Sequence, residues 1–352
     1  MKAAKASKFQ SIQICRGLAA LLVLLFHATG VSKAYLNRDL LWGFFQFGYS
    51  GVDCFFVLSG FVIYWAHRGD VGRSERIRIY LKKRFLRIYP IYWIVAVILL
   101  PIYFGAPHDV SGYIVLLKSF LLLPQPGNPV VTVAWSLSHE VFFYGMFALA
   151  IYFSWRRIRA LFLVWLVITA LVYLGKLLTL GALQLPPHTG FVFSPYSLEF
   201  AMGCAIGYLI GRYHPVFDRA IAMLGVTIFL VCGLNEGLLH VRFGRHHSIL
   251  IYGFSSMLIV WGAVLWEQRS RIVMPSLLML LGDASYSIYL THFALLDLLV
   301  RGTLALNLHT LIEPTVVAVI VIALSLGLGV LFYLYVERPV LAGLRKRRLI
   351  QS

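Results

Sequence analysis

The sequence predicts an all-α fold, a polytopic membrane bundle of about ten transmembrane helices. Of its 352 residues, 60% are hydrophobic and only 13% are charged, whereas a soluble domain carries about 25% charged residues. The mean hydropathy is +0.82. Apolar stretches of about 20 residues, the length that crosses a bilayer, recur from one end of the chain to the other.

Each predicted span is an apolar stretch close to this length. The spans are expected at 11–30, 44–66, 85–105, 131–154, 159–178, 193–212, 217–235, 248–266, 275–299 and 314–337. The shorter stretch 111–124 precedes a Pro-Gly turn and is expected to be interfacial or re-entrant. Because no tandem repeat or linker is found, the chain 1–352 is predicted to be one domain with short tails at 1–10 and 338–352.

The basic residues indicate the orientation of the bundle. Twenty-three of the 31 Lys and Arg residues fall in segments that are cytoplasmic if the N-terminus is inside, against seven in the outer loops and span edges. This bias follows the positive-inside rule, so both termini are predicted to be cytoplasmic. Topology and attraction to anionic membrane lipids then explain the net charge of +17, and nucleic-acid binding is not needed.

The sequence predicts neither a metal site or disulfide framework at the cysteines nor a cleaved signal peptide at the N-terminus. The four cysteines lie inside apolar runs without the spacing of a metal site or a disulfide framework, so no metal is predicted. The N-terminal lysines and the apolar stretch after them are similar to a signal peptide, but no cleavage site of small residues follows. We therefore interpret this stretch as an uncleaved first helix.

Ionisable residues inside the predicted spans are the first sign of function, because each costs about 2.5–3.5 kcal/mol at mid-membrane. The first span carries Arg16 and His27, eleven residues apart, which places them on one helix face about 16 Å apart along the axis. Alone, Arg16 fits a positive-inside residue whose head reaches the interface, and His27 fits a core histidine. Together on one face they favour a polar site.

The basic loop before the third span is a candidate anion site. Arg84 and Arg87 are three residues apart and share a helix face, with Lys83 beside them. Planar guanidinium groups suit phosphate oxygens. The alternative is positive-inside charge that faces lipid head groups.

The fourth span places polar residues on two neighbouring faces. Ser136, Glu140 and Tyr144 are four residues apart and share one face, while Trp135 and His139 share the adjacent one. A carboxylate at this depth must be protonated, paired or in a wet cavity. We expect Glu140 to pair with His27 and to orient its imidazole, as a carboxylate does for a catalytic histidine.

Several other polar positions leave two interpretations open. Asp53 either belongs to a polar site or pairs with a basic neighbour in a closely packed helix. Ser285, Tyr289 and His292 form a stripe that fits a hydrogen-bonded helix seam nearly as well as a substrate path. Glu337 is interpreted as an interfacial charge.

Seven short motifs follow one another along nearly the whole chain. They are the pair Arg16 and His27, SGVDCFFVLSGFVI at 50–63, the pair Arg84 and Arg87, WSLSHE at 135–140, EFAMG at 199–203, GDASYSIYLTH at 282–292 and ERP at 337–339. In this order they resemble the membrane acyltransferase family 3, in particular its exopolysaccharide and lipopolysaccharide O-acetyltransferases. The resemblance implies a ten-helix enzyme that moves an acyl group, usually acetyl, from a coenzyme A thioester to a sugar hydroxyl.

The residues and the resemblance together give one set of expected roles. Predicted to be catalytic are His27 and Glu140; to bind the donor, Arg16, Arg84, Arg87 and Lys83; and to add polarity to the site, Asp53, Ser136, His139, Tyr289 and His292. His27 either takes the proton of the acceptor hydroxyl as a general base or carries the acyl group briefly.

The expected donor is cytoplasmic acetyl-CoA, acting as a substrate. The expected acceptor is a cell-surface or exported polysaccharide or its lipid-linked oligosaccharide precursor, and the expected location is the cytoplasmic (inner) membrane. One alternative is a transporter or flippase of a lipid-linked sugar. Another is an acyltransferase that acts on a lipid, peptidoglycan or a glycoside. A non-enzymatic scaffold would leave the intramembrane ionisable residues without a role.

Overall fold

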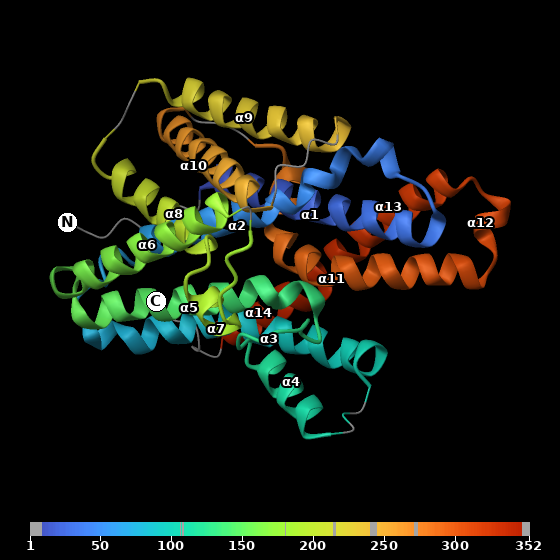
Figure 1. Ribbon diagram of the computed structural model, residues 1–352, viewed down its shortest axis with the longest axis horizontal. Coiled ribbons are helices and arrows are strands. Elements are labelled where there is room, and N and C mark those ends of the chain that lie inside the picture. Colours follow the sequence, from blue (N-terminus) through green and yellow to red (C-terminus); the bar gives the residue numbers. More distant parts are fainter. Residues whose placement is uncertain are drawn as a thin grey trace.

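The computed structural model is an all-helical bundle, as predicted (Figure 1). The structure describes residues 9–105, 107, 109–179, 181–213, 216–239, 245–270 and 274–346, apart from the side chains of 41, 42 and 245–248. The predicted tails at 1–10 and 338–352 lie partly outside the described residues.

Eighteen helical segments follow one another along the described chain. The first half contains α1 (Gln10–Leu36), η1 (Leu40–Ser50), α2 (Gly51–His67), η2 (Ser74–Arg76), α3 (Ile77–Tyr103), α4 (Val110–Phe120), η3 (Thr132–Ala134), α5 (Trp135–Phe153) and α6 (Trp155–Leu178). The second half contains α7 (Pro187–Val192), α8 (Tyr196–Ile210), α9 (Asp218–Leu238), α10 (Arg245–Arg269), α11 (Ser276–Ala305), α12 (Leu308–Leu311), α13 (Pro314–Phe332), η4 (Tyr333–Glu337) and α14 (Arg338–Lys346).

Nine segments of the described chain are long and apolar enough to cross a membrane. They correspond to nine of the ten predicted spans, because an apolar chain in lipid must satisfy its backbone hydrogen bonds within each helix. The one predicted span without a counterpart is 193–212, the sixth along the chain. It contains α8, which has only 15 residues. At about 1.5 Å per residue it rises about 22 Å, less than the roughly 30 Å of a hydrocarbon core.

Central and peripheral helices differ in how much apolar surface they bury. In the segment Gly43–His67, 67% of the most apolar window is buried, whereas in α6 the share is 17%. Leu161, Leu163 and Leu171 on α6 are more than half exposed, at 58%, 59% and 61%. Such side chains suit contact with lipid tails, which are as apolar as leucine itself. The polar residues therefore gather around the central helices.

Glycines bring the central helices close together. On α1 and α11, Gly17 and Gly282 face each other, and a side-chain carbon at Gly17 would lie 2.8 Å from the Gly282 nitrogen. On α2 and α8, Gly60 and Gly203 allow a similar approach, because a side-chain carbon at Gly203 would overlap the carbonyl oxygen of Val57. Close approach through small residues is typical of helices in membranes.

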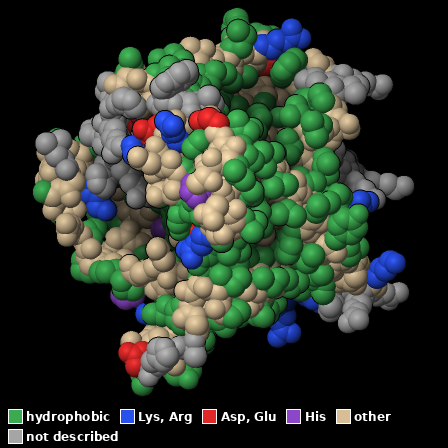
Figure 2. Space-filling model, turned by 90° about the vertical axis from the view of Figure 1, so that its right-hand side faces the viewer, with side chains coloured by type: hydrophobic (Ala, Val, Ile, Leu, Met, Phe, Trp, Pro, Cys, Tyr) green, Lys and Arg blue, Asp and Glu red, His purple; other side chains and the backbone are tan. Residues whose placement is uncertain are grey.

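The bundle has two distinguishable ends. At the end called the basic end here, α1 and α3 begin and α2 ends, with the rings of Phe9 and Trp65 5.5 Å apart. At the opposite end, the Tyr35 hydroxyl on α1 donates to Asp297 on α11 at 2.8 Å. Figure 2 looks at this opposite end, where hydrophobic side chains dominate and charged ones are scattered. The cytoplasmic location of the basic end stays a prediction.

The short helix α4 lies beside α3 and projects from the bundle (Figure 1). Hydrogen bonds tie its C-terminal end to α3: the Tyr92 hydroxyl donates to the Ser119 carbonyl at 2.7 Å, and the Trp93 indole donates to the Phe120 carbonyl at 2.9 Å. Its 11 residues are too few to cross a bilayer. Whether the segment is interfacial or re-entrant stays a prediction.

Candidate functional site: two adjoining cavities

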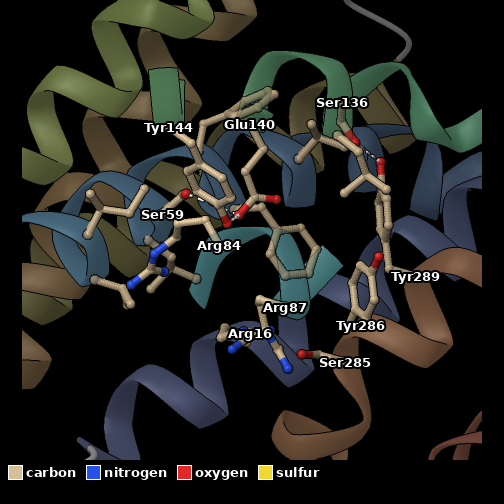
Figure 3. Close-up of a pocket in the computed structure, with 17 residues that line it drawn as sticks. Arg16, Ser59, Arg84, Arg87, Ser136, Glu140, Tyr144, Ser285, Tyr286 and Tyr289 are labelled. Atoms are coloured by element: carbon tan, nitrogen blue, oxygen red, sulfur yellow. Dashed lines mark hydrogen bonds between the residues drawn. The ribbon is translucent and has the colours of Figure 1, made fainter. Parts of the chain in front are cut away.

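A small cavity in the half of the bundle near the basic end collects six of the predicted site residues. Its volume is about 120 Å³, and α1, α2, α3, α5 and α11 contribute to its walls. Figure 3 shows its polar side chains pointing toward one another. The six residues are Arg16, Arg84, Arg87, Ser136, Glu140 and Tyr289. We call this space the arginine cavity.

Glu140 is held in the arginine cavity by two hydroxyl groups. The Tyr144 hydroxyl donates to its Oε1 at 2.5 Å, and the Ser59 hydroxyl donates to the same atom at 3.3 Å. Ser136, Glu140 and Tyr144 all line the cavity, which confirms the face predicted from their four-residue spacing. Ser59 comes from α2 and lies within the motif at 50–63, but it was not among the predicted site residues, because a serine beside a glycine indicates close helix packing as readily as a polar site.

Arg87 is neutralised by a buried carboxylate. Its Nη1 lies 3.2 Å from Oε1 of Glu337, which is only 1% exposed, and the Ser287 hydroxyl donates to the other carboxylate oxygen at 2.6 Å. The interpretation of Glu337 as an interfacial charge was therefore wrong. The helix continues from α13 through a π-helical turn, η4, which carries the carboxylate in between α3 and α11.

Arg84 has a neutral partner instead. Its Nη2 lies 2.7 Å from Nε2 of His67, and its guanidinium carbon lies over the rings of Tyr80 and Tyr144, 5.7 and 5.5 Å from their centroids. Within the described residues, neither Arg84 nor Arg16 forms an ion pair with a carboxylate. Since arginine stays protonated, these two side chains leave the arginine cavity with cationic groups suited to an anionic ligand.

A wider cavity of about 790 Å³ lies in the other half of the bundle. Its size falls in the range of roughly 300–1,000 Å³ that is usual for pockets that bind small molecules. Aromatic and polar side chains from α1, η1, α2, α5, α8, α9 and α11 line it, among them Phe26, His27, Gln46, Tyr49, Asp53, Trp135, Tyr196, Glu236 and Tyr289. We call this space the wide cavity.

His27 lies in the wall of the wide cavity and does not meet Glu140. Its ring packs 5.1 Å from the ring of His292 and 5.0 Å from those of Phe26 and Phe293. No hydrogen bond joins His27 to Glu140 among the described residues, and the two line different cavities. The predicted pairing was therefore wrong.

The reason for this separation lies in the helix packing. Arg16 and His27 lie about three turns apart on α1, and Glu140 lies at the level of Arg16. Two residues, Val52 and Tyr289, line both cavities and so form the wall between them. The Tyr289 hydroxyl is fixed in this wall by Ser136 at 2.6 Å and by the Val133 carbonyl at 3.1 Å.

The remaining predicted residues take different places. His292 is completely buried behind His27, where its Nδ1 lies 2.7 Å from the Tyr289 carbonyl, and it lines neither cavity. Lys83 is also outside both linings. His139 lines a third cavity, of about 130 Å³, and stacks on Phe191 at 4.2 Å. The predicted second face of α5 is thus real, but it points away from the arginine cavity.

Asp53 and Glu236 add carboxyl groups to the wide cavity. Asp53 is 2% exposed, and the carboxyl of Glu199 lies beside it. Glu236 accepts hydrogen bonds from the hydroxyls of Tyr49 at 2.9 Å and Tyr252 at 3.2 Å. Glu236 lies one residue beyond the predicted span 217–235, so the sequence carried no sign of an intramembrane carboxylate at this position. Within the described residues, no cluster of His, Cys, Asp and Glu has the arrangement of a metal site.

The comparisons with known proteins agree with the motif order. Residues 9–334 match the sequence model of the acyltransferase 3 family, which is described as an acyltransferase domain. The chain is 30% identical over 322 residues to the exopolysaccharide production protein ExoZ of Rhizobium meliloti (strain 1021). The matched region covers 86% of this chain and 93% of ExoZ.

Two more distant relatives are longer proteins. The chain is 24% identical over 356 positions to the O-acetyltransferase OatA of Staphylococcus aureus (strain NCTC 8325 / PS 47), covering 90% of this chain and 55% of OatA. It is 22% identical over 376 positions to the peptidoglycan O-acetyltransferase OatA of Listeria monocytogenes, covering 94% of this chain and 55% of that protein. The chain thus spans about half the length of the OatA proteins. No solved structure matches it.

Proposed function

Since the chain belongs to the acyltransferase 3 family, we propose that it is a membrane O-acetyltransferase that works across the two adjoining cavities. The donor, acetyl-CoA, binds from the basic end at the arginine cavity. The acceptor is a hydroxyl group of a polysaccharide or of its lipid-linked precursor, and it binds in the wide cavity. The observation that carries this proposal is the pair of chemically different cavities that share the wall of Val52 and Tyr289.

The charges of the arginine cavity support an anionic donor. Arg16 and Arg84 are cations without a carboxylate partner among the described residues, and guanidinium groups bind phosphate oxygens with good geometry. Arg87 is different, because Glu337 already neutralises it. We therefore assign Arg84 and Arg16 to the donor and Arg87 to the support of the cavity.

The aromatic and polar walls of the wide cavity support a sugar acceptor. Tyr49, Trp135 and Tyr196 offer flat apolar faces, and Gln46 and Glu236 offer hydrogen-bonding groups. A pocket that is mostly apolar with a few placed polar groups is the usual form of a small-molecule site. The names of two relatives include O-acetyltransferase, and one of them names peptidoglycan as its acceptor. The ExoZ name refers to exopolysaccharide production.

The transfer step uses His27 as the base. Its imidazole nitrogen takes the proton of the acceptor hydroxyl while the hydroxyl oxygen bonds to the thioester carbonyl carbon. The carbon–sulfur bond then breaks, and the coenzyme A thiolate leaves and takes up the proton. Because Val52 and Tyr289 line both cavities, the thioester passes these two side chains to reach His27. The alternative is two successive transfers: a ring nitrogen of His27 first bonds to the thioester carbonyl carbon while the coenzyme A thiolate leaves. The acceptor hydroxyl then takes the acyl group from the imidazole and gives up its proton, which the thiolate takes up.

Transfer of labelled acetyl groups tests the proposal directly. The purified protein in lipid vesicles is supplied with labelled acetyl-CoA and with polysaccharide from a strain that lacks this gene. We expect label on the polysaccharide with the native protein and at least about 10²-fold slower labelling with His27→Ala. Translocation of a lipid-linked sugar without any acetyl transfer would instead identify a transporter.

A further inference from the structure

We propose that His67 and Asp70 are positioning residues that fix the guanidinium group of Arg84 in the arginine cavity. Neither residue lines the cavity, so they act on the acyl donor through Arg84. The inference rests on the donor site proposed above and adds two residues that set the affinity of that site. It also predicts how this affinity changes with pH.

The hydrogen bonds around His67 allow only one protonation state. Arg84 Nη2 lies 2.7 Å from His67 Nε2, and His67 Nδ1 lies 2.8 Å from Asp70 Oδ2. Arginine has donors and no acceptor, so Nε2 must accept through its lone pair. Nδ1 then carries the proton and donates a hydrogen bond to the Asp70 carboxylate. The imidazole in this arrangement is neutral and has a defined tautomer.

Local structure holds the imidazole in this orientation. His67 is the last residue of α2 and is only 5% exposed. The chain turns directly after it, and the Asp70 amide donates to the His67 carbonyl at 2.9 Å. The ring of Tyr80 packs edge-on against the imidazole at 4.9 Å. The turn and the packing therefore bring Asp70 back to the side of His67 that faces away from Arg84.

A neutral partner holds Arg84 without cancelling its charge. The comparison within the same cavity is Arg87, whose charge is balanced by the carboxylate of Glu337 at 3.2 Å. The Nε of Arg84 is also buried and has no hydrogen-bond partner among the described residues. Arg84 therefore keeps its positive charge for an anionic group of the ligand, and its Nε is a buried donor without a partner in the described part of the chain.

Protonation of His67 would break this arrangement. An imidazolium has donors on both nitrogens, so Nε2 could no longer accept from Arg84, and two cations would face each other. The groups around the imidazole are the carboxylate of Asp70, the cations of Arg84 and Lys83 and the hydroxyl-bearing ring of Tyr80. Imidazole groups titrate between about pH 5 and 8. Burial and the Arg84 cation oppose protonation of His67, so we expect donor affinity to fall as the pH on the basic side falls toward the acid end of this range.

Three variants separate the positioning role from a merely structural one. His67→Gln keeps a side-chain acceptor for Arg84 but cannot titrate, His67→Phe removes the acceptor, and Asp70→Asn weakens control of the tautomer. At about pH 7.5 we expect His67→Phe to raise the KM for acetyl-CoA about tenfold, the effect of one hydrogen bond to a charged group. Its kcat should stay within about threefold. His67→Gln should stay close to the native KM. Asp70→Asn should fall between the two.

The pH profile gives a readout that a structural role would not move. Between about pH 7.5 and about pH 5.5, the KM of the native protein for acetyl-CoA should rise, and that of His67→Gln should stay flat. His309→Gln, at the opposite end of the bundle on α12, is the matched control and should keep the native profile. An unchanged KM in His67→Phe, or a native pH profile in His67→Gln, would overturn the proposal.

The outcome also distinguishes this inference from the proposed function. A native protein that transfers acetyl groups without any dependence on acetyl-CoA would refute the donor assignment, before any variant is compared. If His67→Phe does not insert into the membrane, the pH profiles of His67→Gln and Asp70→Asn test the role of His67 instead. Each of these variants retains a polar side chain at the substituted position. Identical profiles in the native protein and in both variants would again refute the role of His67.

Discussion

The arginine cavity and the wide cavity share a wall but differ in size and in the chemistry of their linings. The first is about 120 Å³ and holds three arginines and Glu140, whereas the second is about 790 Å³ and is lined by aromatic rings, His27 and two further carboxyl groups. Fixed cations suit an anionic donor. A large pocket with a titratable imidazole suits an acceptor that must lose a proton. The difference is the basis on which the proposed function places the two substrates in opposite halves of one bundle.

The largest expected effect concerns His27, the proposed base in the wide cavity. His27→Ala should lower kcat for acetyl transfer about 10²- to 10⁴-fold, the range that general-base catalysis contributes. Binding of acetyl-CoA should be unchanged, because His27 does not line the arginine cavity. Transfer assays and equilibrium binding of labelled donor measure the two effects, with His188→Ala on α7 as the control. Weakened donor binding in His27→Ala would break the division between the cavities.

The second prediction separates the two arginines of the basic motif by their effect on stability. Arg87→Ala leaves the buried carboxylate of Glu337 without its cation, which should lower the free energy of unfolding by about 3–5 kcal/mol. The additional change Glu337→Gln should restore part of the loss. Thermal unfolding in detergent measures both variants. If Arg87→Ala unfolds at the native temperature, the ion pair does not support the arginine cavity.

Arg84→Ala should act on the donor more than on the fold. Loss of a hydrogen-bonded charge is worth about 1.5–3 kcal/mol, so the KM for acetyl-CoA should rise about 10- to 100-fold. The KM for the acceptor should stay constant, since Arg84 lines only the arginine cavity. Steady-state kinetics with each substrate varied in turn tests this split. Equal changes in both KM values would mean that the cavities do not hold separate substrates.

A smaller effect is expected on the acceptor side. Glu236→Gln replaces a carboxylate that accepts from Tyr49 and Tyr252 by a weaker acceptor, which should raise the KM for the acceptor about 3- to 10-fold. The KM for acetyl-CoA should not change. Measurement with a soluble oligosaccharide acceptor provides the comparison. A selective effect on the donor would move Glu236 out of the acceptor half.

Lys83→Ala should have the smallest effect. Lys83 lies next to Arg84 in sequence but is only half-buried and lines neither cavity, so the KM for acetyl-CoA should change less than about twofold, as expected for a charge outside the site. The same kinetic assay used for Arg84→Ala measures it. A change as large as that of Arg84→Ala would extend the donor site beyond the arginine cavity.

The sequence by itself determined which segments are helices and which residues share a face of one helix. Hydropathy alone located nine of the spans, because lipid leaves an apolar segment no alternative to internal hydrogen bonding. The four-residue spacing of Ser136, Glu140 and Tyr144 correctly placed all three in one cavity wall, since helix geometry follows directly from sequence position. The motif order was sufficient to identify the family.

Only the tertiary structure decided which faces meet. Glu140 was expected beside His27 but lies with Ser59 and Tyr144, and Glu337 was expected at the interface but pairs with Arg87 in the interior. Such contacts depend on the rotation and depth of each helix against its neighbours. Those are set by the close approach of backbones at glycines and by the π-helical turn, neither of which has a periodic signal in the sequence.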